Sequence, residues 1–166
     1  MPSRAQLTRV PLAQLRLAQP DWRLRESAIL ALGAVAEGCR AGLELMAPQI
    51  VQFMLPLLAD PRPLVRSIAC WTLGRYCKWL FPRDGQPPSA TLQTLQAELL
   101  DGLLKRVMDR SKPVQAAACC ALAALEEEAG DALVPKLQPI LQHLTAALGS
   151  VRATAAHRLF RRTALT

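Results

Sequence analysis

The stretch VRSIACWTLG at residues 65–74 decides the fold, because the chain contains it three times in recognisable form. It aligns without gaps with LRESAILALG at residues 24–33 and with VQAAACCALA at residues 114–123. In every copy the fifth residue is Ala, the ninth is Leu and the tenth is Gly or Ala. The copies begin 41 and 49 positions apart, so the chain repeats a unit of about that size.

Each copy has the hydrophobic spacing of an amphipathic helix. If its first residue is numbered zero, positions zero, four, eight and eleven lie on one side of a helix with 3.6 residues per turn. Small residues at positions four and nine allow a neighbouring helix to approach closely. Helical repeats of roughly 40–47 residues are typical of HEAT and armadillo proteins. The expected core stripe consists of Leu24, Ala28, Leu32 and Val35, then Val65, Ala69, Leu73 and Tyr76, then Val114, Ala118, Leu122 and Leu125.

A less regular leading helix is expected before the second and third copies and again after the third. Gln49–Ala59 and Thr91–Asp109 precede the second and third copies, and Leu133–Gly149 begins an unfinished fourth repeat. Proline removes a helical hydrogen bond and clashes with the preceding turn, so we expect Pro56 and Pro139 to kink these helices. The sequence therefore predicts an all-α fold, a HEAT-repeat α-solenoid of about three helical hairpins plus a partial fourth.

Composition and charge divide the chain into three segments. Residues 20–149 hold the repeats, residues 1–19 form a divergent segment with a partial leading helix, and residues 150–166 form a divergent basic tail. The formal charge is +7, yet residues 20–149 contain 13 basic and 13 acidic residues. The positive excess therefore lies at the two ends. We expect no basic stripe on the repeats and no direct contact with nucleic acid, and a nucleic-acid binder acting through the ends is an alternative.

The cysteines and histidines do not have the spacing of a metal site. Zinc commonly takes four ligands that include Cys pairs two to four residues apart, and no such pair accompanies His143 and His157. The chain has no glycine-rich phosphate loop and no nucleophile with a base at useful spacing. We therefore expect no cofactor, no metal, no enzyme activity and no membrane span. The cysteines are expected to be small buried hydrophobic residues: Cys39, Cys70, Cys77, Cys119 and Cys120.

The opposite side of these helices does not look like an ordinary solvated face. It is largely small or apolar, with Trp71 at its centre and acidic residues, Glu37 and Glu126–Glu128, at its far end. Such a face suits an extended peptide with hydrophobic and basic side chains. The alternative is that Leu30, Ile68 and Trp71 pack under the next repeat. Positions three, six, ten and thirteen form this second-helix face: Ser27, Leu30, Ala34 and Glu37, then Ile68, Trp71, Arg75 and Lys78, then Ala117, Cys120, Ala124 and Glu127.

Three stretches resemble a known family in detail. DWRLRESAILALGAVAEGC at residues 21–39, LVRSIACWTLGRY at residues 64–76 and the segment Leu122–Ala129 are similar to the transportins, nuclear import receptors of the importin-β family. The resemblance covers roughly Pro20 to Leu148. The transportins are several times longer, so this chain is expected to hold about three repeats from the middle of such an array.

The resemblance implies a function in nuclear import. Transportins bind nuclear localisation signals of the proline–tyrosine class on a concave face lined by the second helices. Carried over to this chain, the apolar pocket uses Leu30, Ile68 and Trp71, with Arg75 beside them, and Glu127 faces basic residues of the signal. The implied partners are cargo signals and nucleoporins, and the implied location is the cytoplasm and nucleus.

Two departures from the family limit this expectation. Ran binding belongs to the N-terminal repeats of the family, and these repeats are absent from this sequence. The two ends of the chain, residues 1–19 and 150–166, do not follow the family pattern. The alternatives are a structural HEAT scaffold for another protein partner and a non-functional truncated paralogue.

Overall fold

A computed structural model describes residues 17–38, 43–81, 88–146 and 149. The predicted end segments, residues 1–19 and 150–166, therefore lie almost wholly outside the described residues. The chain separates into two units, Met1–Gly130 and Asp131–Thr166, which are described individually.

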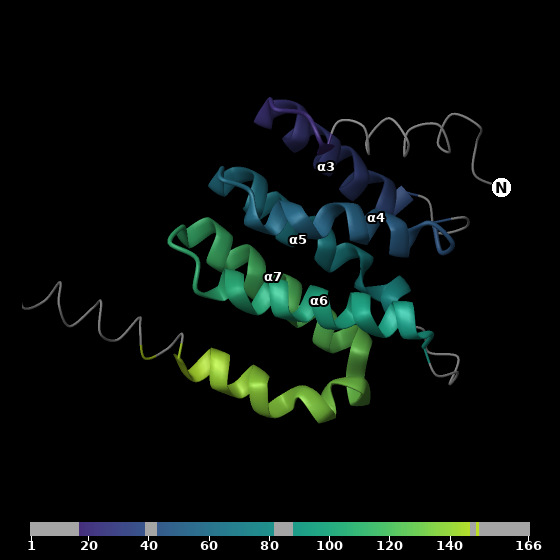
Figure 1. The fold of residues 1–166 in the computed structure, drawn as a ribbon, viewed down its shortest axis with the longest axis vertical. Helices are drawn as coiled ribbons and strands as arrows, with labels where there is room; N and C mark the ends of the chain where they lie inside the picture. Colours follow the sequence, from purple (N-terminus) through teal and green to yellow (C-terminus); the bar gives the residue numbers. More distant parts are fainter. Residues whose placement is uncertain (1–16, 39–42, 82–87, 147–148, 150–166) are drawn as a thin grey trace, which may run out of the picture. The chain divides into compact units, whose positions relative to one another are not determined.

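The first unit is built from helices (Figure 1). The described residues contain no strand, which confirms the all-α prediction. None of the described helices is both long enough and apolar enough to cross a membrane. In chain order the elements are α3 (Trp22–Gly38), α4 (Ala47–Met54), the 3₁₀ helix η1 (Leu55–Ala59), α5 (Pro63–Leu80), α6 (Ala90–Val107) and α7 (Lys112–Ala129).

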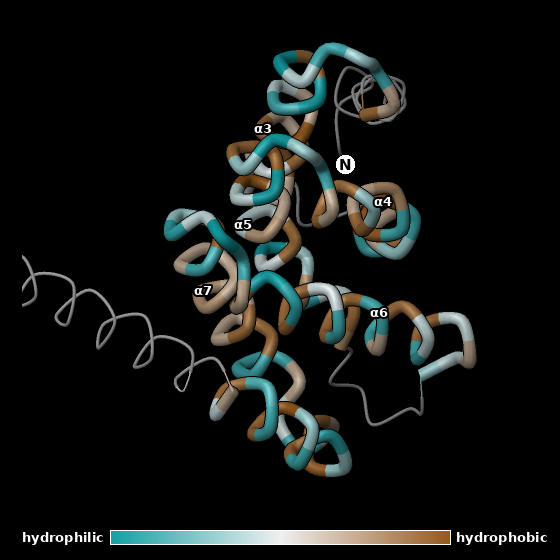
Figure 2. The backbone as a smooth tube through the Cα atoms, turned by 60° about the vertical axis from the view of Figure 1, so that its left-hand side comes forward, coloured by the Kyte–Doolittle hydropathy of each residue, from teal (hydrophilic) through white to brown (hydrophobic). Residues whose placement is uncertain are grey.

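Two layers of helices make up this unit. The repeated segments form α3, α5 and α7, and α5 contacts both of the others along its length. The leading helices α4 and α6 contact each other and cover the other side, with α4 against α5 and α6 against α7. In Figure 2 hydrophobic and hydrophilic residues alternate along α5 and α6, as expected when one side of a helix is buried. This is the predicted arrangement of stacked HEAT hairpins.

The predicted stripe forms most of the core between the layers. Its residues in α5 are 0% exposed, and Ala28, Leu32, Val114, Ala118 and Leu125 are also buried. The prediction was wrong for Leu24, which is 39% exposed. Leu24 lies in the first turn of α3. The hydrogen bonds that α5 side chains donate to α3 reach it only further along, between Ile29 and Ala36, where α5 covers the helix. Val35 and Leu122 are only partly exposed.

The two prolines predicted to kink helices behave differently. At Pro56 the leading helix changes from α4 to the 3₁₀ helix η1, as the missing amide hydrogen requires. The prediction for Pro139 was wrong. A 3₁₀ helix, η2 (Gly130–Lys136), contains Pro135, and an α-helix follows over residues 137–146. Pro139 falls in the first turn of that helix, where an amide hydrogen has no helical partner to lose.

Two buried arginine–aspartate pairs join successive hairpins. Arg25 Nε lies 2.8 Å from Asp60 Oδ2, and Arg66 bonds both carboxylate oxygens of Asp109 at 2.8 Å. Arg66 holds the pKa of Asp109 below its usual value mainly through this hydrogen bond. Arg66 also donates to the carbonyl oxygens of Asp60 and Pro61 in its own turn. These arginines therefore fix the register of one repeat against the next.

Candidate functional site

The structure leaves the second-helix face open to solvent. Leu30 is 44% exposed and Trp71 is 42% exposed, while Ile68 is partly exposed. The alternative that these side chains pack under the next repeat is therefore wrong for Leu30 and Trp71. An exposed indole on a HEAT surface is available for contact with another molecule.

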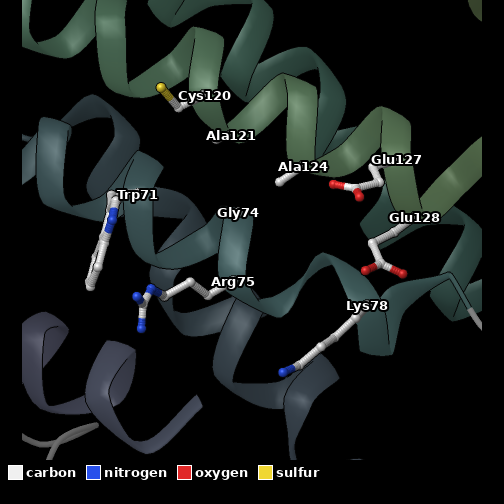
Figure 3. Close-up of a pocket in the computed structure, with 9 residues that line it drawn as sticks. All are labelled: Trp71, Gly74, Arg75, Lys78, Cys120, Ala121, Ala124, Glu127 and Glu128. Carbon is white, nitrogen blue, oxygen red and sulfur yellow. The ribbon is translucent and has the colours of Figure 1, made fainter. Parts of the chain in front are cut away.

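A cleft of about 360 Å³ lies on this face between α5 and α7 (Figure 3). Two of the residues that line it, Gly74 and Ala121, are small and allow the two helices to approach closely. A Cβ atom on Gly74 would lie 3.1 Å from the Cα of Ala121. The residues that line the cleft are Trp71, Gly74, Arg75, Lys78, Cys120, Ala121, Ala124, Glu127 and Glu128.

Trp71 stands at one end of the cleft, and its neighbours fix its orientation. The Arg75 guanidinium carbon lies 3.9 Å from the centre of the indole ring, and Arg75 Nη1 donates to the carbonyl oxygen of Gly33 at 3.2 Å. A Cβ atom on Gly33 would lie 2.7 Å from Trp71 Cζ3. The indole is thus held between the backbone of α3 and a guanidinium group, an arrangement that cation–π attraction stabilises.

The other end of the cleft carries charge. Figure 3 shows Glu127 and Glu128 on α7 across the hollow from Lys78 on α5. The Lys78 ammonium group donates to the carbonyl oxygen of Ala36 at 3.4 Å and lies 4.1 Å from the centre of the Trp79 ring. Glu127 is exposed and Glu128 partly so. A guest chain in this cleft would meet an aromatic surface at one end and carboxylates at the other.

The structure brings together three of the five predicted site residues. Trp71, Arg75 and Glu127 line the cleft, whereas Leu30 and Ile68 do not. Leu30 lies on α3 one turn before Gly33, which contacts the indole, and Ile68 lies one turn before Trp71 on α5. Both therefore extend the apolar surface beyond the end of the cleft that Trp71 forms.

The five predicted site residues leave out others that belong to this site, among them Lys78, which was already expected on the second-helix face. Lys78 and Glu128 line the cleft, and Gly33 sets the position of the indole. Gly33 and Gly74 both occupy position nine of the repeat. The small residue at this position was the sequence feature that could have indicated their part in the site. Glu128 belongs to the acidic run Glu126–Glu128, but which members of that run face α5 depends on the packing of α7.

The described cysteines are of two kinds. Cys70 and Cys77 are buried, as predicted, and burial raises the pKa of each thiol to about 12. The prediction was wrong for Cys119 and Cys120, which are exposed. Both lie in α7 on the sides that face away from the core, and Cys120 lines the cleft. No three His, Cys, Asp or Glu residues of the described chain are grouped so that they could hold a metal ion.

Comparisons with known proteins agree with this architecture. A family model of HEAT-like repeats matches residues 22–76. The chain is 51% identical over 145 residues to Transportin-1 of Oryza sativa subsp. japonica, a match that covers 86% of this chain. It is 46% identical over 135 residues to human Transportin-1 and 44% identical over 135 residues to importin subunit beta-2 of Schizosaccharomyces pombe, each match covering 81% of this chain. The chain belongs to the transportin family.

The chain spans a small part of these transportins. It matches 16% of the rice protein and 14% of the human and fission-yeast proteins.

Proposed function

We propose that this chain acts in nuclear import by binding localisation signals of the proline–tyrosine class on the second-helix face. The similarity to proteins named transportin and importin subunit beta-2 supports the import role. Activity of this kind places the protein in both the cytoplasm and the nucleus.

One observation carries the proposal: an exposed indole stands at the head of a cleft whose far end is acidic. Arg75 covers part of the Trp71 indole, and the part that stays exposed offers Pro and Tyr rings a flat apolar surface. Trp is among the residues that contribute most at interfaces. The carboxylate of Glu127 can pair with an Arg or Lys side chain of the guest. Leu30 and Ile68 supply further apolar surface on the indole side.

The test is a titration of the whole chain with a fluorescent peptide that carries a basic stretch followed by Pro-Tyr. Trp71→Ala should weaken binding by about 2 kcal/mol, or roughly thirtyfold in Kd, because the indole is the central anchor. Replacing Pro-Tyr with Ala-Ala in the peptide should weaken binding by a similar factor.

Phe53→Ala is the matched control. Phe53 is 52% exposed, but it lies on α4 in the other layer of helices. Its removal should leave the Kd unchanged. Equal affinity of the wild type and Trp71→Ala for the Pro-Tyr peptide would contradict the proposed site, and circular dichroism would establish that both variants keep their helices.

A further inference from the structure

The turns that precede α3, α5 and α7 lie along one edge of the first unit, at the left of Figure 1. Hydrogen bonds join them in series. Arg25 donates to the carbonyl oxygens of Gln19 and Pro20 in the first turn and to Asp60 in the second. Arg66 links the second turn to Asp109 in the third in the same way. The three turns therefore form a continuous surface.

This surface is basic, although residues 20–149 as a whole are neutral. The matched segments 19–25, 60–66 and 109–115 contain six Arg or Lys and three Asp residues. Asp60 and Asp109 are each only 7% exposed and are already bonded to arginines. The exposed charges of the segments are then one carboxylate, Asp21, and four cations, which we call the basic turn edge: Arg23, Arg62, Arg110 and Lys112.

The repeats were expected to carry no basic stripe, yet these turns expose four cations and one carboxylate. Glu26, which is partly exposed, directly follows the first segment. Other acidic residues lie further away, such as Glu126, Glu127 and Glu128 in the last turn of α7, far along that helix from Lys112. Ion pairing between repeats also buries two of the carboxylates that would neutralise the edge. The net charge of the sequence could not show that the basic and acidic residues lie apart, because this pattern depends on which carboxylates the fold buries.

We propose that the basic turn edge binds an acidic peptide segment of a partner protein. Packed helices lie roughly 8–10 Å apart, so cations on successive turns repeat at about that interval. An extended polyproline-type chain advances about 3.1 Å per residue with three residues per turn, which brings every third side chain to the same side. Carboxylates three residues apart in such a segment match the spacing of the turns.

The aromatic residue of this edge favours a peptide over a single-stranded nucleic acid. Single strands bind by stacking their bases on accessible aromatic rings between cations. The Trp22 ring already carries the guanidinium groups of Arg23 and Arg62, whose carbons lie 5.2 and 5.5 Å from the ring centre. A base would have to displace these groups, whereas a carboxylate can bond to them where they lie.

The experiment measures fluorescence anisotropy of a fluorescein-labelled (Glu-Pro-Pro)₅ peptide with the full chain. Arg62→Glu combined with Arg110→Glu should raise the Kd at least tenfold at physiological salt. The matched control combines Lys105→Glu with Lys136→Glu, which changes the net charge equally at positions outside the edge. This control should stay within twofold of the wild type, as should Trp71→Ala, because the cleft is a separate site.

Three results would overturn the proposal. The first is an equal loss of peptide affinity in the two double variants, which would show that binding depends on overall charge. The second is unchanged peptide affinity in both double variants, which would assign binding to the basic ends of the chain. The third is tighter binding of a labelled oligouridylate with the same dependence on Arg62 and Arg110, which would make the edge a nucleic-acid surface.

Discussion

At the scale of single residues, the position of the Trp71 indole depends on the absence of a side chain at Gly33. A methyl group there would lie 2.7 Å from Trp71 Cζ3 and 3.1 Å from Thr72 Oγ1. Because Trp71 is exposed, its ring can move outward to relieve this contact. Helix propensity also favours Ala over Gly by about 1 kcal/mol, which offsets part of the strain.

We therefore expect Gly33→Ala to weaken binding of the Pro-Tyr peptide roughly tenfold, or about 1.4 kcal/mol, with a change below about 1 kcal/mol in the free energy of unfolding. Peptide titration and urea unfolding measure the two quantities. Gly102→Ala is the control, because its methyl group would contact Leu58 in the other layer. Loss of stability without loss of affinity in Gly33→Ala would contradict the role assigned to this glycine.

The cysteines give a second prediction at this scale. In a Cys39→Ser background at pH 8, iodoacetamide should modify Cys119 and Cys120 within minutes and leave Cys70 and Cys77 intact. Burial raises the pKa of the last two to about 12, so almost no thiolate forms at this pH. Mass spectrometry of tryptic peptides measures the rates. Modification of Cys77 as fast as Cys120 in the folded protein would contradict the described packing of α5.

At the scale of secondary structure, the ion pairs between hairpins connect stability to pH. The folded protein holds the pKa of Asp109 below the ordinary value of 3.8, mainly through the hydrogen bond from Arg66. A lowered carboxyl pKa adds stability that is complete above the unfolded pKa and is lost as pH falls through the folded pKa. The contribution of this pair should therefore be constant at neutral pH, begin to fall as the pH drops below about 3.8, and disappear only below the lower pKa that Asp109 has in the folded protein.

Asp109→Asn should remove this contribution. We expect it to lower the free energy of unfolding at pH 7 by about 1.5–3 kcal/mol. It should also make the free energy of unfolding less dependent on pH between about pH 5 and pH 2.5. Urea titration at each pH measures both effects. Asp101→Asn is the control, because Asp101 pairs with Lys105 at a largely exposed position. A pH profile for Asp109→Asn that parallels the wild type would contradict the assignment.

Sequence patterns predicted the elements better than their exact boundaries. The repeat of Ala and Leu at fixed positions predicted α3, α5 and α7. A kink was expected at Pro56, and the structure changes there from α4 to η1. Pro139 was misjudged because the helix around it starts at residue 137, so that the proline occupies a first turn. A proline kinks a helix only when the helix extends well before it, and the sequence did not fix that start.

At the scale of the whole molecule, the repeat was predictable, whereas the exposure of the second-helix face, the cleft and the charge pattern needed the structure. The repeat appears directly in the sequence spacing. The cleft depends on how closely Gly74 approaches Ala121, and this contact joins residues of two different repeats. The basic turn edge depends on which aspartates are buried, so a charge count over residues 20–149 concealed it.

The most direct test of the account asks whether a bound signal peptide covers the cleft between α5 and α7. Cys120 lines this cleft, and the adjacent exposed thiol Cys119 does not. Alkylation rates can be measured separately in Cys119→Ser and Cys120→Ser variants, both in a Cys39→Ser background, with and without saturating Pro-Tyr peptide. We expect bound peptide to slow alkylation of Cys120 severalfold and to leave the rate at Cys119 unchanged; bound peptide that leaves both rates unchanged would show that it does not lie in the cleft.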